Sequence, residues 1–223
     1  MIVDNDRQLA RFRLIRGLLM GLAFVTAAGT ACRQAPNPLL FGSMNTTRTT
    51  DDPGSVPWAE PMQIRGLPNL YKVSDDLYRG ARPTAEGFGE LKKLAIKTVV
   101  NLEESNGDQA KLAELGLAYE HIPMTAFFVK DNEVVRFLRI VDAPGHAPIF
   151  VHCRRGADRT GLMCAVYRIA LQGWTKDEAI AEMTQGGFRF NHGYQNIVNY
   201  IRDVDIDRIR QRAAPAPALV ESR

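Results

Sequence analysis

One segment constrains the fold of this chain more than any other: a short apolar run that leads into a polar loop and then into an apolar helix. The run is Ile149, Phe150 and Val151, and it follows a proline-bounded turn at residues 144–148. Because the run is apolar throughout, it predicts a central strand with helices on both faces. A polar loop begins where this strand ends, and a helix is expected at residues 160–171.

Apolar runs alternate with breakers through the rest of the central region, as in an α/β domain. Strands that alternate with helices present their carboxyl ends at one edge of a parallel sheet, where ligands bind. The sequence therefore predicts an α/β fold with a central, mostly parallel sheet flanked by helices. The expected strands lie at 77–79, 98–102 and 118–122, and the expected helices lie at 85–94, 109–115, 133–141, 175–184 and 194–209.

Residues 1–31 have the layout of a secretory signal peptide. A stretch that contains Arg7, Arg11, Arg13 and Arg16 precedes an apolar run at residues 18–28, which ends in small residues. The run is shorter than the roughly 20 apolar residues of a membrane-spanning helix. A signal peptide is therefore favoured over a permanent N-terminal anchor.

Cys32 directly follows these small residues, where a bacterial lipoprotein carries its lipidated cysteine. The lipoprotein pattern prefers Leu three residues earlier, where this chain has Gly29, so lipidation and plain cleavage both stay open. An acyl chain on Cys32 would hold the protein at a membrane face without spanning it. The N-terminus predicts an exported bacterial protein, either periplasmic or anchored to a membrane through Cys32 or the apolar segment.

Composition divides the rest of the chain into three parts. Residues 32–55 form a linker and residues 211–223 a tail, both rich in Pro and small or polar residues, and both are expected to be disordered. Residues 56–210 hold the apolar runs and are expected to form one folded domain.

Net charge and cysteine usage exclude some functions. Four arginines at the extreme N-terminus contribute to the formal net charge of +3, so charge does not predict a nucleic-acid partner. Three cysteines are too few for a disulfide scaffold, and a single reactive thiol is expected. No spacing of His, Cys and Asp demands a metal ion.

The loop at residues 153–160, named here the cysteine loop, combines a nucleophile with an anion site. It lies between a strand end and a helix N-terminus, where unpaired N–H groups and the helix dipole stabilise an anion such as a thiolate or a phosphate. Gly156 allows the backbone to curl around a ligand. Cys153, at the start of the loop, is the candidate nucleophile.

The other residues of the cysteine loop are candidates for binding phosphate. Arg159 is expected to bind two phosphate oxygens with its planar guanidinium, which Lys cannot reproduce. Thr160 is expected to donate its hydroxyl to the sulfur of Cys153. The remaining phosphate-binding candidates are Arg154, Arg155, Gly156, Ala157 and Asp158, and the first two add positive charge at the rim.

These residues resemble the C-x5-R-[ST] signature loop of the cysteine-dependent protein tyrosine and dual-specificity phosphatases, with Cys153, Arg159 and Thr160 in the defined positions. Residues 76–84 and 96–102 also resemble the opening elements of compact dual-specificity-like phosphatases. The resemblance implies a phosphatase domain at residues 56–210. It implies that the enzyme hydrolyses phosphate monoesters through a cysteinyl-phosphate and needs no metal or organic cofactor. The implied substrate is a phosphorylated protein or a small phosphate monoester.

Two carboxylates are candidates for the general acid that protonates the leaving group. The family normally places an Asp on the loop that corresponds to residues 123–132, and Asp131 is the carboxylate there. Asp131 is equally placed to cap the next helix. Asp158 resembles the loop aspartate of myotubularin-type phosphatases, although it is also placed to pair with an arginine. Asp131 is preferred slightly, and both assignments stay open.

Ala157 bears on the substrate. Phosphoinositide and inositol-phosphate phosphatases of this superfamily often carry Lys at that position, so Ala157 favours phosphotyrosine or a small monoester. A phosphoinositide or inositol-phosphate phosphatase is the alternative. A catalytically silent phosphate-binding module is a further alternative, because the general acid is not assigned.

Overall fold

A computed structural model describes residues 57–215 of the chain. The predicted signal peptide or anchor (1–31), the linker (32–55) with Cys32, and residues 216–223 of the predicted tail lie outside the described residues. No helix within the described part is long and apolar enough to cross a membrane. The elements are β1 (Glu60–Pro61), β2 (Tyr71–Lys72), β3 (Leu77–Ala81), α2 (Gly87–Lys93), β4 (Thr98–Asn101), α3 (Gln109–Glu114), β5 (Ala118–His121), α4 (Asp131–Asp142), β6 (Ile149–Cys153), α5 (Asp158–Gln172), α6 (Lys176–Gln185), α7 (Gln195–Asp203) and α8 (Ile206–Ala213).

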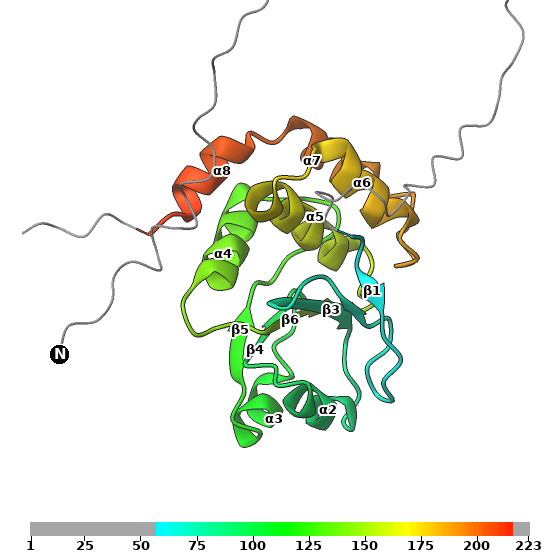
Figure 1. Cartoon of the computed structure of the whole chain (residues 1–223), viewed down its shortest axis with the longest axis vertical. Coiled ribbons are helices and arrows are strands. Elements are labelled where there is room, and N and C mark those ends of the chain that lie inside the picture. The colour runs from blue at the N-terminus through cyan, green and yellow to red at the C-terminus, as the bar shows by residue number, and fades with distance from the viewer. Residues whose placement is uncertain (1–56, 216–223) are drawn as a thin grey trace, which may run out of the picture. The chain divides into compact units, whose positions relative to one another are not determined.

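The strands form one mixed sheet in the order β1-β2-β3-β6-β4-β5 (Figure 1). β1 pairs with β2 and β2 with β3 in antiparallel fashion, whereas β3, β6, β4 and β5 run parallel. β6, which contains the apolar run, lies between β3 and β4 in the middle of the parallel part. The predicted central, mostly parallel sheet is confirmed.

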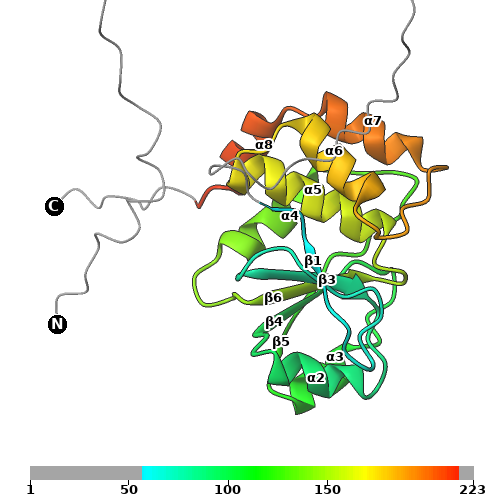
Figure 2. The ribbon, with the colours of Figure 1, turned by 45° about the vertical axis from the view of Figure 1, so that its right-hand side comes forward.

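Helices cover both faces of this sheet (Figure 2). α4 to α8 lie on one face, and α2 and α3 lie on the other. Successive residues of β6 supply the two cores: Ile149 and Val151 pack in the core under α4 to α8, and Phe150 packs in the core with α2 and α3. All three side chains are fully buried, as the apolar run predicts.

The C-terminal region differs from the predicted single helix at residues 194–209. α7 ends at Asp203, and the side chain of Asp205 accepts a hydrogen bond from the N–H of Arg208 at 3.0 Å, which caps α8. α8 continues to Ala213, beyond the domain boundary placed at residue 210. β1 and β2 were not predicted either.

Candidate active site

Four loops meet at the carboxyl edge of the parallel strands. Ala81 at the end of β3 pairs with Cys153 at the end of β6, and Asn101 at the end of β4 pairs with His152 and with His121. The loops after β3, β4, β5 and β6 therefore start at one level of the sheet. A pocket of about 340 Å³ opens there. The cysteine loop contributes Cys153, Arg154, Arg155, Asp158 and Arg159 to its lining.

The cysteine loop curls closely against β3. Gly156 has a φ of +68°, and a Cβ atom at this position would lie 2.3 Å from the carbonyl carbon of Gly80. A residue with a side chain therefore meets both a backbone clash and an unfavourable φ. The curl that the sequence predicts at Gly156 depends on the absence of a side chain.

Side chains from outside the cysteine loop hold its carbonyl groups. Asn69 Nδ2 donates to the carbonyl of Arg155 at 2.9 Å. Arg79 Nη2 donates to the carbonyls of Gly156 and Ala157 at 2.8 and 3.4 Å. In a trans peptide the next N–H points away from the carbonyl, so these contacts turn the N–H groups of residues 156–158 away from Asn69 and Arg79.

The N–H groups of residues 154–158 have no hydrogen-bond acceptor among the described residues. They lie at the N-terminus of the 15-residue helix α5, where the helix dipole adds positive potential. A row of free N–H groups at a helix N-terminus is suited to bind an anion.

Arg79 is a buried support of this loop. Only 1% of its surface is exposed, and its guanidinium carbon lies 3.7 Å from the ring centroid of Phe188. The aromatic ring and the two carbonyl contacts offset part of the cost of burying the guanidinium, whose Nε has no hydrogen-bond partner among the described residues.

Cys153 lies at the end of β6 with 2% of its surface exposed, and Arg154 and Arg155 next to it are exposed. The rim of the pocket therefore carries positive charge. Cys164, the other described cysteine, is buried in α5, and burial raises the pKa of its thiol to about 11. Cys164 is accordingly protonated at neutral pH and a poor nucleophile.

Arg159 is anchored through one of its nitrogens. Nη1 donates to the carbonyls of Leu102 and Met124, both at 3.1 Å. Leu102 follows β4 and Met124 follows β5, so Arg159 joins these two loops to the cysteine loop. No side chain or carbonyl in the described part of the chain bonds to Nε or Nη2 of Arg159, and two such donors are what a bidentate contact to phosphate uses.

Asp158 and Thr160 lie in the first turn of α5. Asp158 is buried, and its Oδ1 accepts a hydrogen bond from the N–H of Asn191 at 2.8 Å. The buried hydroxyl of Thr160 has no hydrogen-bond partner within residues 57–215. The bond from Thr160 to the sulfur of Cys153 that the sequence predicts is therefore not formed in this structure.

His152 supports the cysteine loop as an uncharged ring. It is fully buried and stacks on Phe150 with the ring centroids 5.7 Å apart. Burial, together with the nearby positive charge of Arg82, lowers the pKa of His152 to about 3. The nearest carboxylate oxygens lie 3.6 Å away on Asp108 and 3.9 Å away on Glu103. At neutral pH His152 is therefore neutral and does not act as a proton donor.

Asp131 is held away from the pocket, contrary to its expected place beside the leaving group. It is the first residue of α4, where its Oδ1 accepts a hydrogen bond from the hydroxyl of Tyr200 at 3.0 Å. Its Oδ2 lies 3.4 Å from Nη1 of Arg212. Asp131 is not among the residues that line the pocket with Cys153. Of the two predicted acids, the structure brings only Asp158 to this pocket, because α7 and α8 hold Asp131.

Several pocket residues were not predicted from the sequence. Thr125, Ala126 and Phe127 follow β5, Glu104 follows β4, and Tyr194 precedes α7. The rings of Phe127 and Tyr194 pack edge to face with centroids 5.3 Å apart, although 66% of Phe127 is exposed. Two adjacent aromatic residues, Phe127 and Phe128, in a loop expected at the carboxyl edge of the sheet were the sequence signal that could have identified Phe127.

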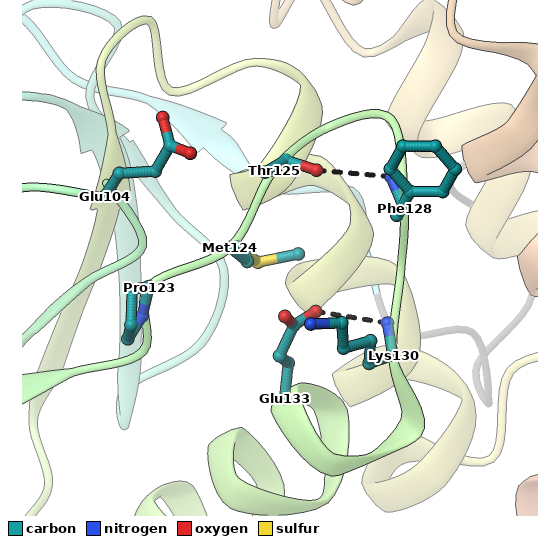
Figure 3. Close-up of a pocket in the computed structure, with 7 residues that line it drawn as sticks. All are labelled: Glu104, Pro123, Met124, Thr125, Phe128, Lys130 and Glu133. Carbon is teal, nitrogen blue, oxygen red and sulfur yellow. Dashed lines mark hydrogen bonds between the residues drawn. The ribbon is translucent and has the colours of Figure 1, made fainter.

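A second hollow has a volume of about 420 Å³, and Figure 3 draws the residues that line it. Glu104 and Thr125 line both spaces. In Figure 3, Glu104 and Thr125 lie at one end of the hollow, and Lys130 and Glu133 lie at the other. Burial raises the pKa of Glu133. Within residues 57–215 no group of three or more His, Cys, Asp and Glu side chains is arranged to hold a metal ion.

Comparison with known proteins agrees with this geometry. A family model described as "DSP-PTPase phosphatase fused to NAD+ Kinase" matches residues 69–198, which is more than half of the chain. The dual specificity protein phosphatase TpbA of Pseudomonas aeruginosa strain UCBPP-PA14 is 36% identical over 173 residues, which cover 77% of this chain and 78% of TpbA. The inositol diphosphatase DSP5 of Arabidopsis thaliana is 28% identical over 155 residues, which cover 65% of this chain and 73% of DSP5.

Solved structures share the fold. The crystal structure of P. aeruginosa TpbA matches with a TM-score of 0.64 at 36% identity, over 74% of this chain and 100% of the crystallised chain. A cysteine-to-serine variant of TpbA in complex with phosphotyrosine matches with a TM-score of 0.64 at 35% identity, over 75% of this chain and 100% of that chain. Given the family model and the extent of its similarity to TpbA, this chain belongs to the DSP-PTPase family, the dual specificity protein phosphatases.

Proposed function

We propose that this phosphatase acts through Cys153, whose thiolate attacks the phosphorus of a phosphate monoester and forms a cysteinyl-phosphate. One observation carries the proposal: the N–H groups of residues 154–158, which have no acceptor among the described residues, directly follow Cys153 at the N-terminus of α5. Free N–H groups and a helix dipole stabilise both a thiolate and the oxygens of a bound phosphate.

Arg159 supplies the second set of donors. With Nη1 fixed on the carbonyls of Leu102 and Met124, Nε and Nη2 are oriented before the substrate binds. These donors bind two phosphate oxygens, and the contact strengthens as charge develops in the transition state. Lysine offers no comparable pair of fixed donors.

Water completes the reaction by attacking the cysteinyl-phosphate. Cys153 then leaves as a thiolate, which the N–H groups of the cysteine loop stabilise again. The hydroxyl of Thr160, buried in the first turn of α5, is the group that we infer donates to this sulfur.

The substrate that we infer is phosphotyrosine in a protein or peptide. Phe127 and Tyr194 form an aromatic wall of the pocket, against which the phenyl ring of phosphotyrosine can pack. Arg154 and Arg155 add positive charge at the rim, which suits acidic residues near the phosphorylated site. The complex of the TpbA variant with phosphotyrosine supports this choice.

An inositol phosphate is the second candidate substrate. Exposed Arg154 and Arg155 also suit a second phosphate group, and DSP5 is named an inositol diphosphatase. Ala157 adds no charge to the site. Comparing kcat/KM for a phosphotyrosine peptide and for a diphosphoinositol phosphate decides between the two substrates.

The test of the mechanism is hydrolysis of p-nitrophenyl phosphate without added metal, with the Cys153→Ser and Arg159→Lys variants alongside. We expect no turnover by Cys153→Ser, inhibition of the unmodified enzyme by vanadate, and a loss of about 100-fold or more for Arg159→Lys. Turnover by Cys153→Ser would exclude the thiol mechanism. A folded but inactive unmodified protein would favour a phosphate-binding module.

We also propose that the protein is exported. The arginine-rich stretch and the apolar run at residues 18–28 support a signal peptide, and Cys32 or the apolar run is the candidate membrane tether. N-terminal sequencing and palmitate labelling of the cellular protein distinguish a released chain, a lipoprotein that begins at Cys32 and an uncleaved anchor. A full-length chain in the cytosolic fraction would contradict export.

A further inference from the structure

The pocket around Cys153 needs a proton donor, and the loop after β5 does not supply one. Residues 123–130 of this loop contain no Asp or Glu, and Asp131 is held by Tyr200 and Arg212. An alkoxide or phenoxide is a poor leaving group unless a positioned acid protonates it. Among the residues that line the pocket, Glu104 and Asp158 are the carboxylates.

Asp158 has a positioning role in this structure. Its buried carboxylate takes the N–H of Asn191 at 2.8 Å and so joins the cysteine loop to the segment before α7. Tyr194, part of the aromatic wall, lies in this segment. One oxygen of Asp158 is thereby committed to a backbone contact.

Glu104 has a free carboxylate on a fixed backbone. The N–H of Leu102 donates to the carbonyl of His152 at 2.9 Å, and Leu102 also accepts from Arg159. The N–H of Glu103 donates to Oδ1 of Asn101 at 2.7 Å. These contacts hold the chain just before Glu104, whereas no described residue forms a hydrogen bond or ion pair with the exposed Glu104 carboxylate.

Glu104 also lines two neighbouring spaces. It lines the pocket of Cys153 and Arg159 and, together with Thr125, the adjoining hollow of about 420 Å³ (Figure 3). Glu104 therefore lies between the pocket, where the cysteine loop would bind a phosphoryl group, and the adjoining hollow.

We propose that Glu104 is the general acid of this enzyme, a role that rests on the proposed thiol mechanism. As the sulfur of Cys153 forms its bond to phosphorus, the bond from phosphorus to the leaving oxygen breaks, and the carboxyl group of Glu104 transfers its proton to that oxygen. The Glu104 carboxylate then takes a proton from the attacking water while the bond between sulfur and phosphorus breaks. Inorganic phosphate and the Cys153 thiolate result, and Glu104 is protonated again.

Kinetics of Glu104→Gln in the full chain test this role across substrates with different leaving groups. For an alkyl phosphate and for phosphotyrosine, we expect kcat/KM to fall by about 100-fold or more. For p-nitrophenyl phosphate, whose anion leaves readily, we expect kcat/KM to fall by about tenfold at most. Hydrolysis of p-nitrophenyl phosphate within about tenfold of the unmodified enzyme shows in the same assay that the variant is folded.

Two further variants serve as comparisons. Asp131→Asn should keep the leaving-group dependence of the unmodified enzyme, because Asp131 lies outside the pocket. A selective loss on poor leaving groups in Asp158→Asn or Asp131→Asn, with Glu104→Gln unchanged, would overturn the assignment of Glu104. Cys153→Ser distinguishes failure of the thiol mechanism from failure of the acid assignment. Activity of Cys153→Ser would refute the thiol mechanism. An inactive Cys153→Ser together with normal activity of Glu104→Gln would refute only the role of Glu104.

Discussion

Gly156 is the residue of the cysteine loop where a side chain cannot be accommodated. Its φ of +68° disfavours any residue with a side chain, and a Cβ atom would lie 2.3 and 2.4 Å from the carbonyl carbon and oxygen of Gly80. We therefore expect Gly156→Ala to displace the cysteine loop from β3. Because a displacement of about 1 Å can cost about 100-fold in rate, kcat/KM for p-nitrophenyl phosphate should fall by at least about that factor.

Gly173 provides the matched control for Gly156. It has a φ of +72° at the end of α5, but no atom lies within 4 Å of a Cβ placed there. Gly173→Ala should cost about 1 kcal/mol of stability and leave kcat/KM unchanged. Equal kinetic effects of the two substitutions would contradict the steric account of the cysteine loop.

His152 makes stability depend on pH. The folded protein keeps this buried ring neutral because its pKa is lowered to about 3, whereas the unfolded chain binds a proton near pH 6.5. The stabilisation from the neutral ring is therefore complete above about pH 6.5 and is lost as pH falls from there toward about 3. The contribution of His152 to the free energy of unfolding should fall by up to about 1.4 kcal/mol per pH unit in this window.

Urea unfolding at about pH 7 and about pH 5.5 measures this contribution, with His152→Asn as the comparison. Burial raises the pKa values of Asp108 and Glu133, which therefore act in the opposite direction as pH falls. The difference between the unmodified protein and His152→Asn isolates the histidine. An equal loss of stability in both proteins would refute the buried, neutral state of His152.

Among the helices, α8 stabilises the end of α5. Arg210 of α8 donates through Nε to the carbonyl of Ala170 at 2.9 Å and through Nη2 to the carbonyl of Ile169 at 2.7 Å. These carbonyls lie in the last turn of α5, where no intrahelical N–H is available to them. α8 therefore belongs to the folded domain and caps the helix that begins at the cysteine loop.

Removing this cap should affect stability and leave catalysis intact. We expect Arg210→Ala to lower the free energy of unfolding by about 1 to 2 kcal/mol, because two carbonyls lose a charged donor. Arg208→Ala, an exposed position on the same helix, should change it by less than about 0.5 kcal/mol. Urea unfolding together with kcat for p-nitrophenyl phosphate checks both values, and indistinguishable stabilities of the two variants would argue against the cap.

Most elements of the parallel core could be predicted because their signals are local. The apolar run of β6 and the capping box of Thr175 and Glu178 each lie within a few residues, and the structure has both. β1 and β2 have two residues each and no periodicity. The break between α7 and α8 was missed because Ile201, Val204 and Ile209, all buried, extend an apolar pattern past the cap at Asp205.

For the molecule as a whole, the cysteine loop could be predicted because its residues are contiguous in the sequence, whereas the surroundings of the loop depend on distant contacts. Asp131 has the sequence position of a general acid, but Tyr200 and Arg212, far along the chain, determine where its carboxylate lies. Glu104 reaches the pocket only because β4 and β6 are neighbours in the sheet. The family and the candidate nucleophile therefore follow from the sequence, and the candidate acid follows from the fold.

The proposed mechanism requires that phosphate passes through a covalent bond to Cys153. Rapid denaturing quench of the full chain without acid, during turnover of a radiolabelled phosphotyrosine peptide and followed by peptide mapping, detects this bond. We predict labelled phosphate on the peptide that contains Cys153. With radiolabelled p-nitrophenyl phosphate, Glu104→Gln should trap a larger fraction of the enzyme as cysteinyl-phosphate, because loss of the acid and base slows hydrolysis of this intermediate. Steady turnover without any label on Cys153, or label on another residue, would contradict the account.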